Sequence, residues 1–192
     1  GAQYDERTLY QTLYKKALEG APDCGGLMAF NYLSGEPVTG LDEGRPLLIR
    51  KPNAAFTLAN TMRTHLTSAC ASLRIGMDIL AAERVELDAM TGHGGFFKAE
   101  QIGQTIMSAA LGTPVTVMET AGEGGPWGMA VLAAFQQQAN GQPLDAYLGE
   151  RVFGGAKSVT ILATEAESAG FASFMEEYKR CLAVERAAVQ SL

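Results

Sequence analysis

The chain has 192 residues, of which 47% are hydrophobic and 19% are charged. These values are ordinary for a globular protein with a real core, built as one large domain or two small ones. The formal net charge of −6 gives no electrostatic support to the binding of nucleic acid. No apolar run approaches the length of a membrane span. We therefore expect neither a nucleic-acid partner nor a membrane partner.

The cysteines and histidines are few and scattered. Cys24, Cys70 and Cys181 lie far apart and are odd in number, which fits neither a disulfide framework nor a metal knuckle and indicates a reducing compartment. With only His65 and His93 in the chain, a histidine-rich metal site is excluded as well. The first residues do not resemble a signal peptide. We expect a cytoplasmic protein without a metal site of its own, whose cysteines are small buried apolar side chains.

The first part of the chain predicts a helix, a buried strand, a long irregular loop and a long helix. Their limits are 5–18, 27–33, 34–53 and 54–83, in that order. In the long helix, apolar residues recur every three or four positions, so this stripe is expected to form the core of the domain. The stripe consists of Leu58, Met62, Leu66, Ala69, Leu73, Met77 and Leu80.

The second part predicts strands and helices that are joined by two glycine turns. The expected order is a strand (84–90), a glycine turn (91–95), a helix (99–111), a strand (113–119), a second glycine turn and a helix (127–138). A turn region (141–149), a strand (158–162) and a helix (165–189) follow. This alternation is an α/β pattern, and it predicts a sheet that is at least partly parallel and is covered by helices.

Both glycine turns follow the carboxyl ends of predicted strands, at Met90 and Glu119. Ligands of α/β sheets bind at this edge, so the two turns can line one cleft. The stretch GHGGFFK at 92–98 fits neither the G-x-G-x-x-G dinucleotide motif nor the Walker phosphate loop, and a Gly-x-Ser-x-Gly nucleophile motif is absent. What remains is a bare backbone platform from Gly92 to Gly95. It is either a structural corner or a surface for a flat ring or a phosphate.

Three polar side chains near these turns each have two interpretations. Asp88 is either a catalytic carboxylate or, as we favour, an exposed residue on its strand. Glu123 either belongs to a nucleotide cleft or is a carboxylate at a helix N-terminus. His93 either contacts a base or is an exposed turn residue.

The aromatic residues near the turns are also ambiguous. Trp127 follows a proline at a helix start, and we expect it to pack there rather than to stack on adenine. Phe96 and Phe97 are expected either in the core or in the lining of the cleft.

Taken together, these stretches resemble the FGGY carbohydrate kinases, with xylulokinase-like members the nearest. The family has a T-G-G-G turn after a strand, a helix that ends A-D-x-L-G, a P-V-x-V strand and a helix rich in glycine and alanine. This chain has TGHGG at 91–95, AALG at 109–112, PVTV at 114–117 and GMAVLA at 128–133. Upstream, GGLMAFNYLSGE at 25–36 is similar to the family's G-G-L-x-x-x-P-Y-L-S-G-E-R. The resemblance runs from about residue 25 to residue 138.

The chain departs from the family pattern at the turn itself. His93 replaces a glycine, and Phe96-Phe97 stand where the family has Lys/Arg-Ser. The family's E-R-T-P after the first strand is changed to EPVT at 36–39.

The resemblance implies an α/β fold of the actin-like ATPase (ribonuclease-H-like) type, with a mixed sheet flanked by helices. It implies that residues 1–192 are the carboxyl-terminal nucleotide-binding domain of a sugar kinase whose amino-terminal sugar-binding domain is absent. In the family, that absent domain carries the catalytic aspartate, and no segment of this chain resembles it or the Asp-x-Gly phosphate motif. The expected nucleotide-binding residues are Gly92, His93, Gly94, Gly95 and Glu123, and no catalytic residue is expected here.

The implied function is ATP-dependent phosphorylation of a sugar, most readily a pentulose such as xylulose. The cofactors would be ATP and Mg²⁺, and the sugar would be reached through the absent domain. The chain alone is expected to be inactive, and a homodimer is left open. A non-catalytic actin-like interaction or scaffold domain is the alternative, while the failed dinucleotide motif argues against a Rossmann-type oxidoreductase.

Overall fold

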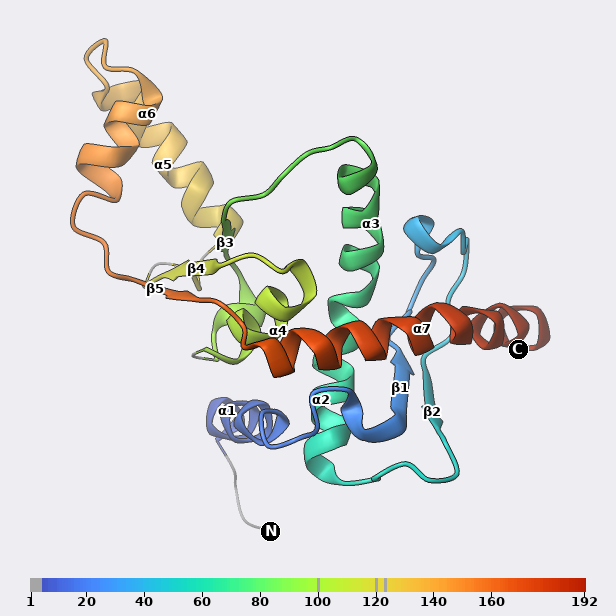
Figure 1. The fold of residues 1–192 in the computed structure, drawn as a ribbon. Coiled ribbons are helices and arrows are strands. Elements are labelled where there is room, and N and C mark those ends of the chain that lie inside the picture. Colours follow the sequence, from blue (N-terminus) through green and yellow to red (C-terminus); the bar gives the residue numbers. More distant parts are fainter. Residues whose placement is uncertain (1–4, 100, 120, 123) are drawn as a thin grey trace.

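The computed structural model describes residues 5–99, 101–119, 121–122 and 124–192. Two small sheets lie at opposite ends of the molecule, and helices join and cover them (Figure 1). In chain order the elements are α1 (Glu6–Ala17), β1 (Leu27–Phe30), β2 (Leu47–Arg50), α2 (Leu58–Ala69), α3 (Ala71–Ala82), β3 (Met90–Gly92), α4 (Ile102–Leu111), β4 (Val115–Met118), α5 (Gly124–Gln138), α6 (Leu144–Tyr147), β5 (Ser158–Ile161) and α7 (Glu165–Ser191).

The larger sheet is mixed, as expected. Its strand order is β3-β4-β5. β3 pairs with β4 in parallel, whereas β5 pairs with β4 in the antiparallel direction, with Val117 opposite Val159. The smaller sheet is an antiparallel pair of β1 and β2, in which Phe30 lies opposite Leu47. The two glycine turns therefore leave neighbouring strands of one sheet.

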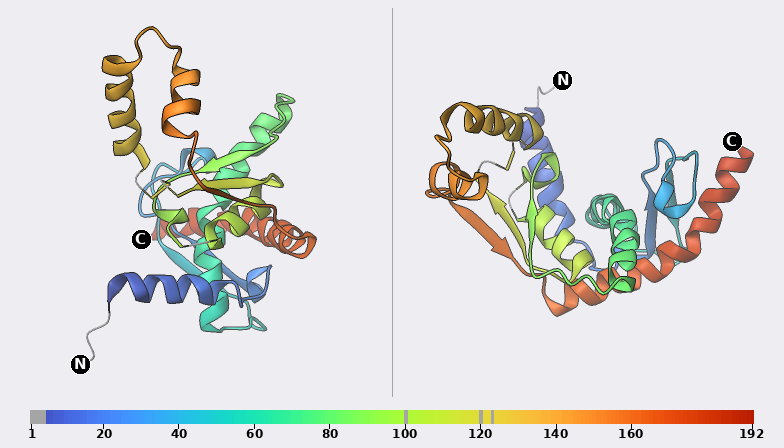
Figure 2. Two further views of the ribbon diagram at one scale, coloured as in Figure 1. Left: turned by 90° about the vertical axis from the view of Figure 1, so that its left-hand side faces the viewer. Right: turned by 90° about the horizontal axis from the view of Figure 1, so that it is seen from above.

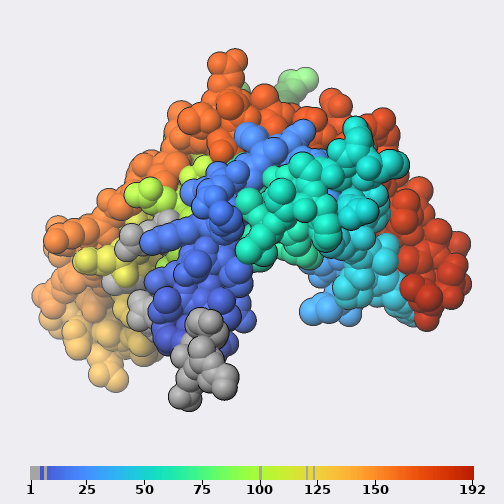
Figure 3. All heavy atoms as spheres, turned by 90° about the horizontal axis from the view of Figure 1, so that it is seen from below, coloured from blue at the N-terminus to red at the C-terminus, as the bar shows by residue number. Residues whose placement is uncertain are grey.

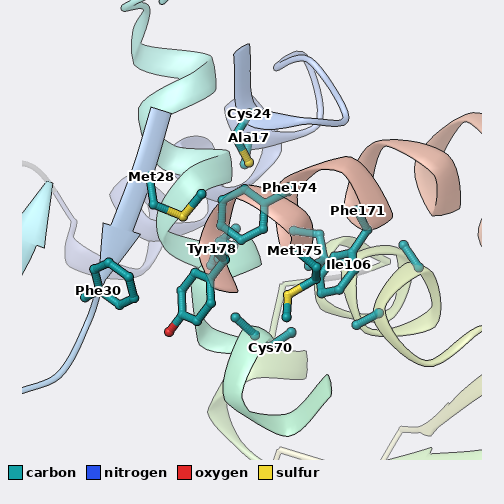
Figure 4. Packing of buried hydrophobic residues seen from close by; sticks show 14 of the residues in the cluster. Ala17, Cys24, Met28, Phe30, Cys70, Ile106, Phe171, Phe174, Met175 and Tyr178 are labelled. Atoms are coloured by element: carbon teal, nitrogen blue, oxygen red, sulfur yellow. The ribbon is translucent and has the colours of Figure 1, made fainter. Parts of the chain in front are cut away.

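The long helix α7 connects the two ends of the molecule, and its apolar face forms much of the core (Figure 1). Phe171, Phe174 and Tyr178 are buried, as the sequence predicts for this helix. The Tyr178 ring lies 4.7 Å from the ring of Phe30, between centroids, and Figure 4 shows this cluster between β1 and α7. The Tyr178 hydroxyl donates to the Tyr32 hydroxyl at 2.6 Å. Because the apolar surroundings disfavour a phenolate, burial raises the pKa of both tyrosines.

The predicted long loop at 34–53 is wrong, because this segment contains β2 and a short 3-10 helix, Pro37–Thr39. It is also fixed against α7. The fully buried Glu185 accepts a hydrogen bond from the Arg45 backbone N–H at 2.6 Å, and Arg186 donates to the Thr39 carbonyl at 2.8 Å. The prolines and glycines of this segment favoured the prediction of a loop, and β2, with only four residues, is too short to show a clear strand pattern.

The predicted single helix over 54–83 is also wrong, because it is divided into α2 and α3 at Cys70. The Cys70 N–H bonds to the Thr67 carbonyl at 3.0 Å, three residues back instead of four. This tighter turn ends α2.

The apolar stripe of this segment is largely not the core. Leu58 is 57% exposed and Leu73 is 38% exposed, whereas Leu66 is 6% exposed. Instead, α2 buries polar residues that have partners. Asn60 accepts from the Ala21 N–H at 2.8 Å, and the buried Arg63 pairs with Glu167 of α7. Hydrogen bonds and an ion pair offset the desolvation of these groups, which periodicity cannot reveal.

Two further boundaries need correction. The strand predicted over 84–90 begins only at Met90 and continues to Gly92, so the first glycine turn starts inside the strand. The turn region predicted over 141–149 contains α6 and the start of a π-helical turn, Leu148–Val152. The remaining predicted helices and strands overlap elements of the same type.

The molecule has the shape of a crescent (Figures 2 and 3). One arm holds α1, the larger sheet and the α5–α6 hairpin, and the other holds the β1–β2 hairpin and the C-terminal end of α7. The α5–α6 hairpin projects from the body, and α5 has no buried residue. None of the helices formed by the described residues combines the length and the apolar character that a membrane crossing requires.

Measurements of unfolding free energy can test which leucines of the α2–α3 stripe belong to the core. Leu66→Ala removes a buried side chain and should lower the free energy of unfolding by about 2–5 kcal/mol. Leu58→Ala on the same helix removes an exposed one and should change it by less than about 0.5 kcal/mol. Urea unfolding monitored by circular dichroism measures both. Equal losses in the two variants would contradict the observed burial.

Candidate functional site

The two glycine turns touch each other. The Gly94 N–H donates to the Ala121 carbonyl at 2.7 Å, and a Cβ added at Gly124 would lie 3.9 Å from the Gly94 Cα. The parallel pairing of β3 and β4 brings the turns to the same edge of the sheet. The prediction that they lie together at the carboxyl ends of strands is confirmed.

Glycine occupies the positions of the first turn for different structural reasons. Gly92 is buried, and a Cβ there would lie 2.6 Å from the Phe97 ring, so packing requires this glycine. Gly94 has φ 94° and ψ −171°, a conformation that is essentially restricted to glycine. A Cβ on Gly95 would have no atom within 4 Å, and its backbone is not strained. The open part of the platform is therefore Gly94 and Gly95.

A groove runs beside the two turns, with a volume of about 1180 Å³. One side is formed by α1, and the other by the glycine turns, the start of α4, and β4 with β5. Gln104 fixes this second side, because its side-chain amide donates to the carbonyls of Val115 at 2.9 Å and Val159 at 2.8 Å. The arrangement is an open, partly apolar groove with exposed backbone at one end.

The charged groups of the groove nearly balance. Among the described residues that line it are the carboxylates of Asp5, Glu6 and Glu119 and the ammonium groups of Lys98 and Lys157. The stem of Lys98 lies along the second glycine turn, since a Cβ on Gly122 would be 3.6 Å from the Lys98 Cε. These described side chains give the groove no concentrated positive charge that would attract a triphosphate.

The other predicted site residues are distributed as follows. His93 is exposed within the first turn. Glu123 lies outside the described residues. Asp88 is exposed, as the favoured interpretation expects, but it precedes β3 and does not lie on the strand.

The aromatic residues near the turns pack against one another. Trp127 contacts the ring of Phe153, with 5.8 Å between centroids, which confirms the packing interpretation. Phe96 and Phe97 meet edge to face at 5.4 Å.

Sequence reasoning missed the wall that α1 contributes. Tyr10 and Tyr14 lie four residues apart on this helix and both line the groove. Their spacing is a signal that they share a face, but nothing in the sequence indicates that this face lies opposite the glycine turns. Lys98 was considered only in the failed test for a phosphate-loop motif, and its place in the groove was missed.

Two of the three cysteines are buried as expected, whereas Cys181 is only partly buried against the core cluster. The two buried residues are Cys24 and Cys70. Burial raises the pKa of both thiols, that of Cys70 to about 12, so neither forms the nucleophilic thiolate at neutral pH. Across the described ranges, no group of three or more His, Cys, Asp or Glu side chains could hold a metal ion.

Solved structures that share this fold include xylulose kinases and a glycerol kinase. A ligand-bound xylulose kinase from Lactobacillus acidophilus superposes with a TM-score of 0.71 at 17% identity, over 94% of this chain and 35% of that chain. A xylulose kinase from Rhodospirillum rubrum gives 0.68 at 14% identity, over 93% and 34%. Plasmodium falciparum glycerol kinase with ADP gives 0.63 at 17% identity, over 93% and 34%. The chain thus spans about a third of the length of these proteins.

The sequence comparisons identify the family. No curated protein sequence matches the chain. The family model described as "FGGY family of carbohydrate kinases, C-terminal domain" matches residues 2–137, which is more than half of the chain and includes both glycine turns. The chain belongs to the FGGY family of carbohydrate kinases, and its fold is that of the actin-like ATPases.

Proposed function

We propose that this chain, over residues 1–192, is the carboxyl-terminal domain of a cytoplasmic ATP-dependent sugar kinase and supplies its adenosine-binding half. The observation that carries the proposal is the contact of the two glycine turns, from Gly94 N–H to the Ala121 carbonyl, beside a groove. The glycerol kinase with the same fold was crystallised with ADP, which supports a nucleotide as the ligand. A pentulose such as xylulose is the substrate that we favour, because xylulose kinases recur among the similar structures.

The residues present fit the nucleoside end of ATP. The Cβ directions of Gly94 and Gly95 are empty, so a flat ring can approach the backbone closely. His93, exposed beside them, is proposed to contact the nucleotide, and Glu123 remains part of the proposal. Gly92 contributes indirectly, because its lack of a side chain allows the Phe97 ring to pack against the turn.

The chain's own residues would bind and orient the nucleotide, while the bound ATP supplies the phosphoryl group. Fixing the adenosine end restricts the position of the reacting phosphate. The base that accepts the proton of the sugar hydroxyl, and the groups that stabilise the phosphate oxygens, are assigned to a sugar-binding domain outside this chain. Mg²⁺ is assigned to the phosphates at the same side, because proteins hold it mainly through one or two carboxylates together with the phosphates of the nucleotide.

The first test blocks the platform. Gly95→Val places a branched side chain into the empty space at Gly95 without backbone strain, so the variant should fold and should bind ADP at least about tenfold more weakly, a loss of about 1.4 kcal/mol. Gly155→Val is the matched control, since Gly155 is also unstrained and open but does not line the groove. Isothermal titration with ADP measures both. Unchanged affinity in a folded Gly95→Val protein would remove the platform from the nucleotide site.

The second test concerns activity. The chain alone holds neither the proposed base nor a phosphate clamp, so it should bind ADP only in the millimolar range, or about 4 kcal/mol. It should release no ADP from ATP in a coupled assay with pentuloses, pentoses or hexoses. A complete xylulose kinase serves as the positive control for the assay. Sugar-dependent turnover that survives repurification would contradict the proposal and would make Asp88 or Glu123 a candidate base.

A non-catalytic interaction domain with the same fold is the alternative. The observation that favours it is the departure of the first turn from the family pattern, with His93 and Phe96-Phe97 in place of the usual residues. Absence of ADP binding by the unmodified, folded chain, at ADP concentrations well above the millimolar range, would favour this alternative over the kinase.

A further inference from the structure

Helix α1 lines the same groove as the glycine turns. Its C-terminal part is anchored in the core, where Ala17 is fully buried and Tyr14 packs against the core cluster. One turn earlier, Tyr10 lies on the same face, because residues four apart are neighbours on a helix. Tyr10 is 56% exposed and lines the groove. The anchored end thus holds an aromatic ring at the groove without burying it.

Within the described part of the chain, the Tyr10 side chain has no evident role in stabilising the fold. It makes no hydrogen bond there and no contact with another aromatic ring, unlike the buried pair Tyr32 and Tyr178. The facing wall has the complementary property, since Gly95 presents bare backbone with open space in front of it. An exposed ring on one wall and bare backbone on the other are suited to a flat ligand between them.

The charges of the groove favour an uncharged ring over a phosphate chain at this position. The carboxylates of Asp5 and Glu6 lie at the start of α1, beside Tyr10, and Glu119 and Lys157 lie on the opposite wall. Glu119 accepts from the Lys157 backbone N–H at 3.5 Å. A polyphosphate placed against α1 would be repelled by the carboxylates of Asp5 and Glu6, whereas a neutral base carries no net charge and would not be repelled.

We propose that Tyr10 stacks on the nucleobase of the bound nucleotide and that α1 thereby completes the adenine site opposite Gly95. This inference rests on the proposed function and adds to it a binding residue on an element remote in sequence from both glycine turns. The phosphates then extend away from α1.

The test compares three variants by titration with adenosine and with ADP. Stacking on an aromatic side chain stabilises a bound base, so Tyr10→Ala should weaken the binding of both ligands at least about fivefold, which corresponds to about 1 kcal/mol. Tyr10→Phe keeps the ring and should stay within about twofold of the unmodified chain. Leu9→Ala is the control on α1, because Leu9 is 45% exposed but does not line the groove; it should have no effect.

A spectroscopic readout separates stacking from a general loss of helix stability. In NMR spectra, the ring protons of Tyr10 should shift when adenosine binds, and this shift should be absent with ribose 5-phosphate. If the unmodified chain binds ADP and Gly95→Val weakens that binding, but Tyr10→Ala remains within about twofold, the role of Tyr10 is overturned and the proposed function stands. If the unmodified chain binds neither adenosine nor ADP, both are overturned.

Discussion

The parallel pairing of β3 with β4 is the constraint on which the candidate site depends. Parallel neighbours end at the same edge of a sheet, so the segments that follow them must leave side by side. In this chain both segments are rich in glycine, and the hydrogen bond from Gly94 to Ala121 joins them. A sheet of short strands thereby creates a surface of bare backbone that neither turn could form alone.

The rest of the fold keeps this edge in place. Gln104 and Ser108 of α4 hold the sheet through buried and partly buried hydrogen bonds. Gln104 donates to two strand carbonyls, and Ser108 donates to the Thr113 carbonyl before β4 and accepts from the Ala163 N–H after β5. α7 then continues from β5 to the β1–β2 hairpin, and the Arg63–Glu167 pair links it to α2. Because α1 packs on α2, the same chain of contacts holds α1 at the side of the groove.

The sequence predicted what depends on local signals. The order of most strands and helices follows from apolar periodicity and from the glycine turns, and the apolar face of α7 with Phe171, Phe174 and Tyr178 is buried as expected. The meeting of the two glycine turns could also be predicted, because it follows from strand direction alone.

The predictions that were wrong concern features that depend on contacts between residues distant in sequence. Arg63 and Asn60 are buried because Glu167 and Ala21 provide partners, so the apolar stripe of α2 and α3 was a misleading guide to the core. β2 has four residues and exists through its pairing with β1. Tyr10 could not be identified as part of the groove, since its place there is set by the packing of α1 on α2. The glycine at position 92 reflects the packing of Phe97, which no local pattern reveals.

The central claim is that both glycine turns form one nucleotide site. The most direct measurement is a titration of the ¹⁵N-labelled chain with ADP, followed by amide chemical shifts. The account predicts that the largest shifts occur together in both turns, at Gly94, Gly95 and Gly122, with a common saturation curve. Shifts confined to the β1–β2 hairpin or to the end of α7, with both turns unchanged at saturation, would contradict it.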